Sequence, residues 1–107
     1  MIPDKLRREV IERDRQRCRW CGQHGEKSGG IDVHHIRYRR GDSDDRLENL
    51  ISLDRSCHGF VHGLHENSPR KAVCQFVLFL CLEQRGSTGS QILRRERAKG
   101  TFKNMEP

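Results

Sequence analysis

The sequence predicts a small α+β domain in which two short strands and several helices surround a histidine-rich segment. Three observations carry this prediction. The stretches 31–36 and 50–53 are short and rich in apolar and β-branched residues, which is typical of strands. Longer stretches on either side place apolar residues at helical spacing and have helix-type ends. The chain has 107 residues, enough for one such domain with an ordered extension.

Residues 3–17 predict an amphipathic helix at the N-terminus. Pro3 suits the first turn of a helix, and Leu6, Val10 and Ile11 form a narrow apolar stripe. The other face mixes arginines with acidic residues, which favours a solvated face over one that contacts DNA phosphates. A polar loop is predicted over residues 23–30.

A long loop that begins with a run of arginines joins the two predicted strands. A loop of this length between paired strands is often functional. Asp54 follows the second strand and is a candidate N-cap. The helix that it would start carries His58 and His62 and is predicted to end near Gly63.

A further helix is predicted to begin at Pro69, to run through about Arg85 and to end at Gly86. Its large apolar residues spread over more than one face; they include Phe76, Leu78, Phe79 and Leu82. Apolar surface that a small domain leaves uncovered suggests a subunit interface. We therefore expect a homodimer through residues 69–85, the alternative being a monomer whose tail folds back over this helix.

The C-terminal tail, residues 91–107, is basic and predicts either a short helix on nucleic acid or a disordered end. Together with the apolar helix it forms a C-terminal extension over residues 67–107. The preceding residues, 1–66, are predicted to form the core of the domain.

Charge and composition restrict the partners of the chain. Lys and Arg number 21 against 15 Asp and Glu, a formal net charge of +6, which favours a polyanionic partner such as nucleic acid.

The N-terminus has no apolar segment typical of a signal peptide, and the longest apolar run, residues 72–82, is too short to span a membrane. We therefore expect a cytoplasmic protein with no membrane association. In a reducing compartment, five cysteines indicate metal ligation or burial.

Four of the six histidines lie between positions 31 and 62. His58 and His62 share one face of the predicted helix, so both can bind one ion. His34 can complete a three-ligand set that leaves a coordination position open, as catalytic metal sites do. Adjacent residues on a strand point to opposite faces, so one member of the pair His34 and His35 stays free for proton transfer.

Cys18 and Cys21 form a C-x-x-C pair, a spacing that lets two thiolates bind one tetrahedral ion. His24 is a candidate further ligand. A rival ligand set would join the cysteine pair to His58 and His62, as in a two-cysteine, two-histidine zinc finger. Such fingers separate the pairs by about 12 residues, whereas 36 residues intervene here, so the rival set is disfavoured.

Four motifs follow one another along the chain: V-I-E-R-D-R-Q-R-C-R-W-C-G, V-H-H-I, L-E-N-L-I-S-L and C-H-G-F-V-H. Together they resemble the His-Asn-His (HNH) endonuclease family over roughly residues 6–64. The resemblance implies a ββα-metal (His-Me finger) core, which is a two-stranded hairpin followed by a helix around one metal ion. The N-terminal helix and the C-terminal helical extension would be added to that core.

The resemblance also implies roles for individual residues. His35 would be the general base that activates water, and a neutral histidine titrates in the right range for this task. Asn49 would hold the His35 segment through hydrogen bonds. A catalytic divalent ion (Mg, Mn, Ni or Zn) would be bound by His34, His58 and His62.

Many members of the family close a four-cysteine zinc site with a second C-x-x-C just before the histidine helix. In this chain the corresponding segment begins with an aspartate, Asp54, in place of the first cysteine. A structural zinc ion is therefore predicted at Cys18, Cys21, Cys57 and Asp54, bound less tightly than by four cysteines. The alternative is that these cysteines are reduced thiols in a small core.

These observations predict a metal-dependent DNA endonuclease that hydrolyses phosphodiester bonds. Open positions on the ion would accept a phosphate oxygen and the leaving 3′ oxygen. Loop arginines are placed to contact DNA phosphates, namely Arg37, Arg39 and Arg40. The alternative function is a non-catalytic, zinc-containing nucleic-acid-binding module, but such a module has no use for a free base beside an open metal position.

Overall fold

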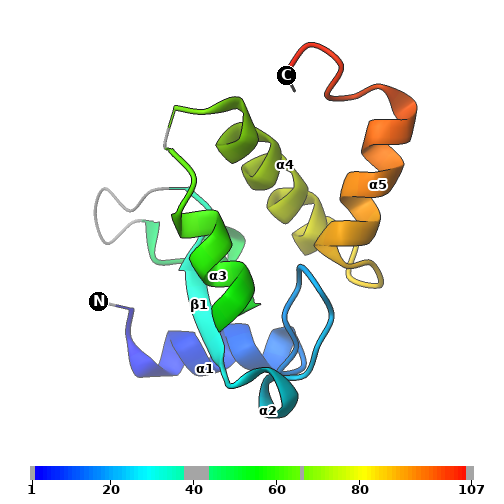
Figure 1. Cartoon of the computed structure of the whole chain (residues 1–107). Helices are drawn as coiled ribbons and strands as arrows, with labels where there is room; N and C mark the ends of the chain where they lie inside the picture. Colours follow the sequence, from blue (N-terminus) through cyan, green and yellow to red (C-terminus); the bar gives the residue numbers. More distant parts are fainter. Residues whose placement is uncertain (1, 38–43, 66, 106–107) are drawn as a thin grey trace.

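A computed structural model describes residues 2–37, 44–65 and 67–105 (Figure 1). Along the chain its elements are α1 (Asp4–Arg13), α2 (Gly25–Ser28), β1 (Ile31–His35), the 3₁₀ turn η2 (Leu47–Asn49), β2 (Leu50–Asp54), α3 (Arg55–His62), α4 (Pro69–Glu83) and α5 (Gly89–Lys99). Two antiparallel strands among helices confirm the predicted α+β class. The order β1, β2, α3 is compatible with a ββα-metal core.

The hairpin of β1 and β2 separates two apolar clusters. In its register Val33 lies opposite Ser52 and His34 lies opposite Ile51. Directly paired residues share a face, and neighbours along a strand alternate. Val33 therefore faces Val10 of α1 in one cluster, whereas Ile51 belongs to the cluster shared with α3 and α4.

The helix α1 ends at Arg13 rather than at the predicted Arg17. The chain turns because the Asp14 carboxylate accepts hydrogen bonds from Arg13 and, at 2.9 Å, from the Ser52 N–H of β2. Arg15 and Gln16 follow with φ values of 57° and 59°, in the left-handed region that commonly ends helices. A tertiary contact, rather than local helix propensity, sets this boundary.

The predicted polar loop over residues 23–30 contains a short helix, α2. His24 is its N-cap, because the His24 Nδ1 accepts a hydrogen bond from the Glu26 N–H at 3.2 Å. The helix ends at Gly29, whose φ of 84° suits glycine.

The C-terminal helices complete the larger cluster, which draws residues from both sides of the predicted boundary between 66 and 67. Ser68 caps α4 and Pro69 occupies its first turn, while α4 ends at Glu83, slightly before the predicted Arg85. α5 begins with a capping box made by Thr88 and Gln91. One of the two predicted alternatives for the tail, a short helix, is therefore observed.

The tail folds back over α4. Phe102 is 2% exposed and its ring meets that of Phe76 edge to face at 5.6 Å between centroids. Leu78 of α4 is fully buried, and Phe76 keeps 43% of its surface exposed. The wrapped-helix alternative thus describes much of α4, and the homodimer remains a prediction. Within the described ranges no helix combines the length and the apolar character needed to cross a bilayer.

Candidate functional site

Three histidines from two elements converge on one point. His34 projects from β1 toward α3, which carries His58 and His62 one turn apart. The ring centroid of His34 lies 5.2 Å from those of both other rings, and His58 and His62 are 4.4 Å apart. One nitrogen from each ring lies within 4.8 Å of the others, so a single ion could contact all three.

Buried nitrogens in this cluster lack hydrogen-bond partners among the described residues. These atoms are Nδ1 and Nε2 of His34 and Nε2 of His58. Burying a polar atom without a partner costs free energy unless a bound ion or ligand supplies the partner. Burial, and then the neighbouring His58 and His62, lower the pKa of His34 to about 3. The imidazole is therefore neutral at neutral pH, and one of its two ring nitrogens offers a lone pair to a cation. The cluster is buried at His34 and exposed at His62, so solvent reaches it at the end of α3.

An aspartate orients one of these histidines. Nδ1 of His58 lies 2.9 Å from Oδ2 of Asp32, which directs Nε2 of His58 into the cluster. Histidines that bind metals usually hold a carboxylate or a carbonyl on their second nitrogen in this way. Sequence reasoning missed Asp32, although its position two residues before His34 puts both on the same face of the strand.

His35 points to a different partner. Its Nε2 lies 2.7 Å from Oδ1 of Asp45, and its side chain is 20% exposed. The predicted division of the pair is observed in this respect: His34 joins the histidine cluster and His35 does not. Asp45 was not singled out from the sequence, because it belongs to the loop between the strands and nothing in its spacing links it to His35.

Asn49 ties the start and the end of that loop together. Its Oδ1 accepts from the Arg37 N–H at 2.9 Å, and its Nδ2 donates to the carbonyls of Asp44 and Arg37 at 3.1 and 3.3 Å. Asn49 is 3% exposed, so these bonds are shielded from water. The asparagine thus holds the backbone at Arg37, two residues after His35, and at Asp44, directly before Asp45.

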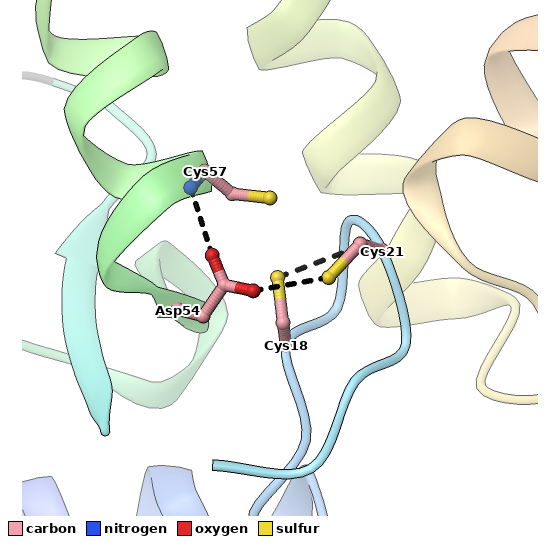
Figure 2. A group of neighbouring side chains, drawn as sticks. All are labelled: Cys18, Cys21, Asp54 and Cys57. Carbon is pink, nitrogen blue, oxygen red and sulfur yellow. Dashed lines mark hydrogen bonds between the residues drawn. The ribbon is translucent and has the colours of Figure 1, made fainter. Parts of the chain in front are cut away.

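A second cluster of sulfur and oxygen atoms lies at the start of α3 (Figure 2). Its four candidate ligand atoms, from Cys18, Cys21, Asp54 and Cys57, lie within 4.8 Å of one another. Asp54 caps α3, because its Oδ1 accepts from the Cys57 N–H at 2.8 Å. Its Oδ2 lies 3.1 Å from Sγ of Cys21. The cluster therefore joins the C-x-x-C turn to the start of α3.

The protonation of this cluster is set by burial and by its internal hydrogen bonds. Burial raises the pKa of Cys21 to about 11, and burial together with the neighbouring Cys18 thiol raises the pKa of Cys57 well above its ordinary value. Burial alone would raise the pKa of Asp54, but hydrogen bonds from the Cys57 N–H and from the thiols outweigh it and lower that pKa. The donor set is three sulfurs and one carboxylate, which zinc accepts.

The structure separates the two ligand sets that the sequence left in competition. Cys18 and Cys21 group with Asp54 and Cys57, and His58 and His62 group with His34, so the rival zinc-finger set is wrong. His24 does not join the cysteine cluster among the described residues, and its Nδ1 caps α2 instead.

Among the three loop arginines, Arg37 alone lies in the described part of the chain, and Arg39 and Arg40 lie outside it. The exposed guanidinium of Arg37 sits over the ring of Phe79, 5.4 Å from its centroid. This stacking holds the cation at the surface near the start of the loop.

The family model of the HNH endonucleases matches residues 18–63, the span from the C-x-x-C turn through the end of α3. The match covers less than half of the chain, but it includes all the ligand candidates of both clusters. No curated protein and no solved structure matched the chain. HNH proteins act on nucleic acid and are generally nucleases, so the chain carries a nuclease or nucleic-acid-binding domain with two clusters that could hold metal ions.

Proposed function

We propose that the protein is a metal-dependent DNA endonuclease that hydrolyses phosphodiester bonds, with His35 as general base and a divalent ion at His34, His58 and His62. The observation that carries this proposal is the convergence of three imidazoles, among which His34 and His58 have buried nitrogens without a hydrogen-bond partner in the described chain. Three histidines with an open side are the donor set of a catalytic metal centre. When bound, the ion supplies Lewis-acid stabilisation of charge on phosphate oxygens.

The proton chemistry falls to His35. An ionised Asp45 can only accept a hydrogen bond, so the 2.7 Å contact favours the His35 tautomer that carries its hydrogen on Nε2. Nδ1 then keeps a lone pair that can take a proton from the attacking water. Asp45 also stabilises the imidazolium that this transfer produces, as the aspartate of a catalytic triad does.

Asn49 and Arg37 act in support of this reaction. Asn49 fixes the backbone at Arg37 and Asp44, and so limits the movement of the loop that carries Asp45. The Arg37 guanidinium, held over Phe79, is available to a phosphate of the bound strand. Positioning a base within a few tenths of an ångström is a large part of its catalytic effect.

We further propose that the cysteine cluster holds a structural zinc ion. Its four donors match the ligand types of zinc, and the site would be filled by protein alone, as structural sites are. Zinc binding there would connect residues 18–21 to the N-terminus of α3. The same helix carries His58 and His62.

The test is the nicking of a supercoiled plasmid with added Mg²⁺ or Mn²⁺. We expect His35→Ala to lower the rate by about 10² to 10⁴, the usual effect of losing a general base, with divalent ion affinity unchanged. His65→Ala is the matched control, because His65 is exposed and belongs to neither cluster. If the wild-type protein binds DNA and never cuts it, the non-catalytic binding module is the correct function; if His35→Ala cuts at the wild-type rate, His35 is not the base.

A further inference from the structure

A cavity of about 430 Å³ lies between the turn after α1 and the junction of α4 with α5. In Figure 1 the blue chain that follows α1 rises against the yellow end of α4 and the orange start of α5. Five arginines line it against a single acidic residue, Asp14; they are Arg13, Arg15, Arg17, Arg19 and Arg85. It shares one lining residue, Cys18, with the cysteine cluster and none with the histidine cluster.

Two of the five arginines build the wall of the cavity. Arg13 makes two 2.9 Å bonds to Asp14 and donates to the carbonyls of Leu47 and Leu50. Arg19 donates to the carbonyl of Cys81 at 2.8 Å. The Asp14 carboxylate is thus neutralised by Arg13 and does not offset the remaining arginines.

The other three arginines surround the opening. Arg15, Arg17 and Arg85 are exposed, and Arg17 makes one 3.1 Å bond to the Gly22 carbonyl. Like charges gathered at a concave surface repel one another and concentrate a positive potential there. An anion with several oxygens would relieve that repulsion and match the planar donors of arginine.

The backbone at this rim adopts a conformation that glycine favours. Arg15 and Gln16 both have left-handed φ values, 57° and 59°. A residue with a side chain costs roughly 1 kcal/mol or more in this region. Arg15 therefore occupies a position where glycine would stabilise the fold, which allows folding and binding to be tested separately.

We propose that this cavity is a phosphate-binding site that takes backbone phosphates of nucleic acid away from the histidine cluster. We choose nucleic acid as the source of the phosphate because HNH proteins act on nucleic acid. This choice does not require that this chain cleaves DNA. Guanidinium groups bind phosphate oxygens through paired hydrogen bonds, and three of them at one rim can engage one or two adjacent phosphates.

The experiment measures binding of a fluorescent DNA duplex without added divalent ion, in the His35→Ala background, across a salt series. Arg15→Gly should raise the melting temperature and weaken duplex binding. The triple variant Arg15→Gly, Arg17→Gln, Arg85→Gln should bind duplex at least about tenfold more weakly at 0.1 M salt. Its salt slope should be smaller by about 0.9 for each phosphate that the variant no longer neutralises.

Two controls separate the site from backbone and net-charge effects. Gln16→Gly removes the same left-handed backbone strain one residue later and should leave duplex affinity unchanged. A second triple variant removes the same charge from exposed residues outside the cavity and should cost much less affinity; it changes Arg8, Arg94 and Lys103 to Gln.

Pyrophosphate titration in the same assay distinguishes the source of the phosphate. Displacement of duplex from the wild-type cavity, absent in the cavity triple variant, supports phosphate binding there. A second outcome is that removing the three arginines abolishes pyrophosphate binding and leaves duplex affinity unchanged. The site would then bind a free phosphate ligand, and the proposal that it binds nucleic acid would be wrong. Wild-type affinity and slope for both probes in the triple variant, or equal weakening in the control triple, overturn the site. Because no outcome depends on cutting, the site and the nuclease proposal can fail independently.

Discussion

The two candidate metal clusters that α3 contributes to differ in how they satisfy their own polar atoms. In the cysteine cluster, Asp54 contacts Sγ of Cys21 and accepts from the Cys57 N–H, and Cys18 Sγ accepts from the Cys21 N–H at 3.5 Å. In the histidine cluster, buried nitrogens of His34 and His58 have no partner in the described chain. A cluster whose polar atoms bond to one another can stabilise the fold, whereas a cluster with unpartnered nitrogens is suited to binding an ion. We therefore expect damage to the first to appear mainly in stability and damage to the second mainly in activity.

The largest effect should follow from removing a histidine of α3. His58→Ala or His62→Ala should lower both divalent ion affinity and nicking by more than about 100-fold, because even the removal of an outer partner costs 10- to 100-fold. Titration calorimetry with Mn²⁺ measures the affinity, and excess ion should partly restore nicking. Wild-type affinity in either variant would show that the ligand set is wrong.

A smaller effect on the same cluster should come from Asp32. Asp32→Ala removes the partner of His58 Nδ1 and should weaken ion binding by about 10- to 100-fold. Asp32→Asn is the matched variant, because its amide oxygen can still accept from Nδ1 and should retain more of the affinity. If alanine and asparagine behave alike and both match the wild type, Asp32 does not orient His58.

The cysteine cluster should respond in stability. Cys18→Ser should abolish bound zinc and lower the melting temperature on the order of 10 °C, which corresponds to roughly 2 kcal/mol in a domain of this size. Elemental analysis and thermal unfolding give the two readouts. Cys74→Ser is the control, since Cys74 is buried outside the cluster and its change should leave zinc content intact. Zinc retained by Cys18→Ser, or absent from the wild type, would favour the buried-thiol alternative.

An effect similar in size to that of Cys18→Ser, seen only at low pH, should be the pH dependence that His34 gives to the ion-free protein. Burial lowers the pKa of His34 from 6.5 to about 3, so below pH 6.5 the unfolded chain binds a proton that the folded chain does not. Stability should therefore fall as the pH drops from 6.5 toward 3, by about 2 kcal/mol at pH 5. Urea unfolding at pH 7.5 and pH 5 in chelator measures this decrease. In His34→Leu the decrease between the two pH values should be smaller by about that amount, and an equal decrease in both proteins would contradict the assignment.

The sequence predicted the longer elements, which local patterns define, and missed the short helix α2 and a boundary that depends on a distant contact. The strands and the histidine helix follow from alternation, from the Asp54 cap and from the four-residue histidine spacing. The end of α1 did not follow, because it depends on the bond between Asp14 and Ser52 of β2.

The candidate site divides in the same way. The convergence of His34 with His58 and His62 could be anticipated from strand and helix periodicity together with the family resemblance. The Asp45 contact with His35 could not, because a loop residue has no periodic relation to the strand that it meets. The arginine-lined cavity arises from segments about 70 residues apart in sequence, Arg15 and Arg85, and no local pattern indicates it.

The short helix α3 has a thermodynamic consequence for the whole molecule. It spans only eight residues, carries Asp54 at its cap and ends with His62. A helix of this length has little stability alone, since isolated helices shorter than about 12 residues are marginal in water. An ion that binds the folded helix through one cluster also stabilises the helical form that the other cluster requires. We expect zinc and the catalytic ion to bind cooperatively, and by reciprocity each should raise the affinity of the other by the same factor.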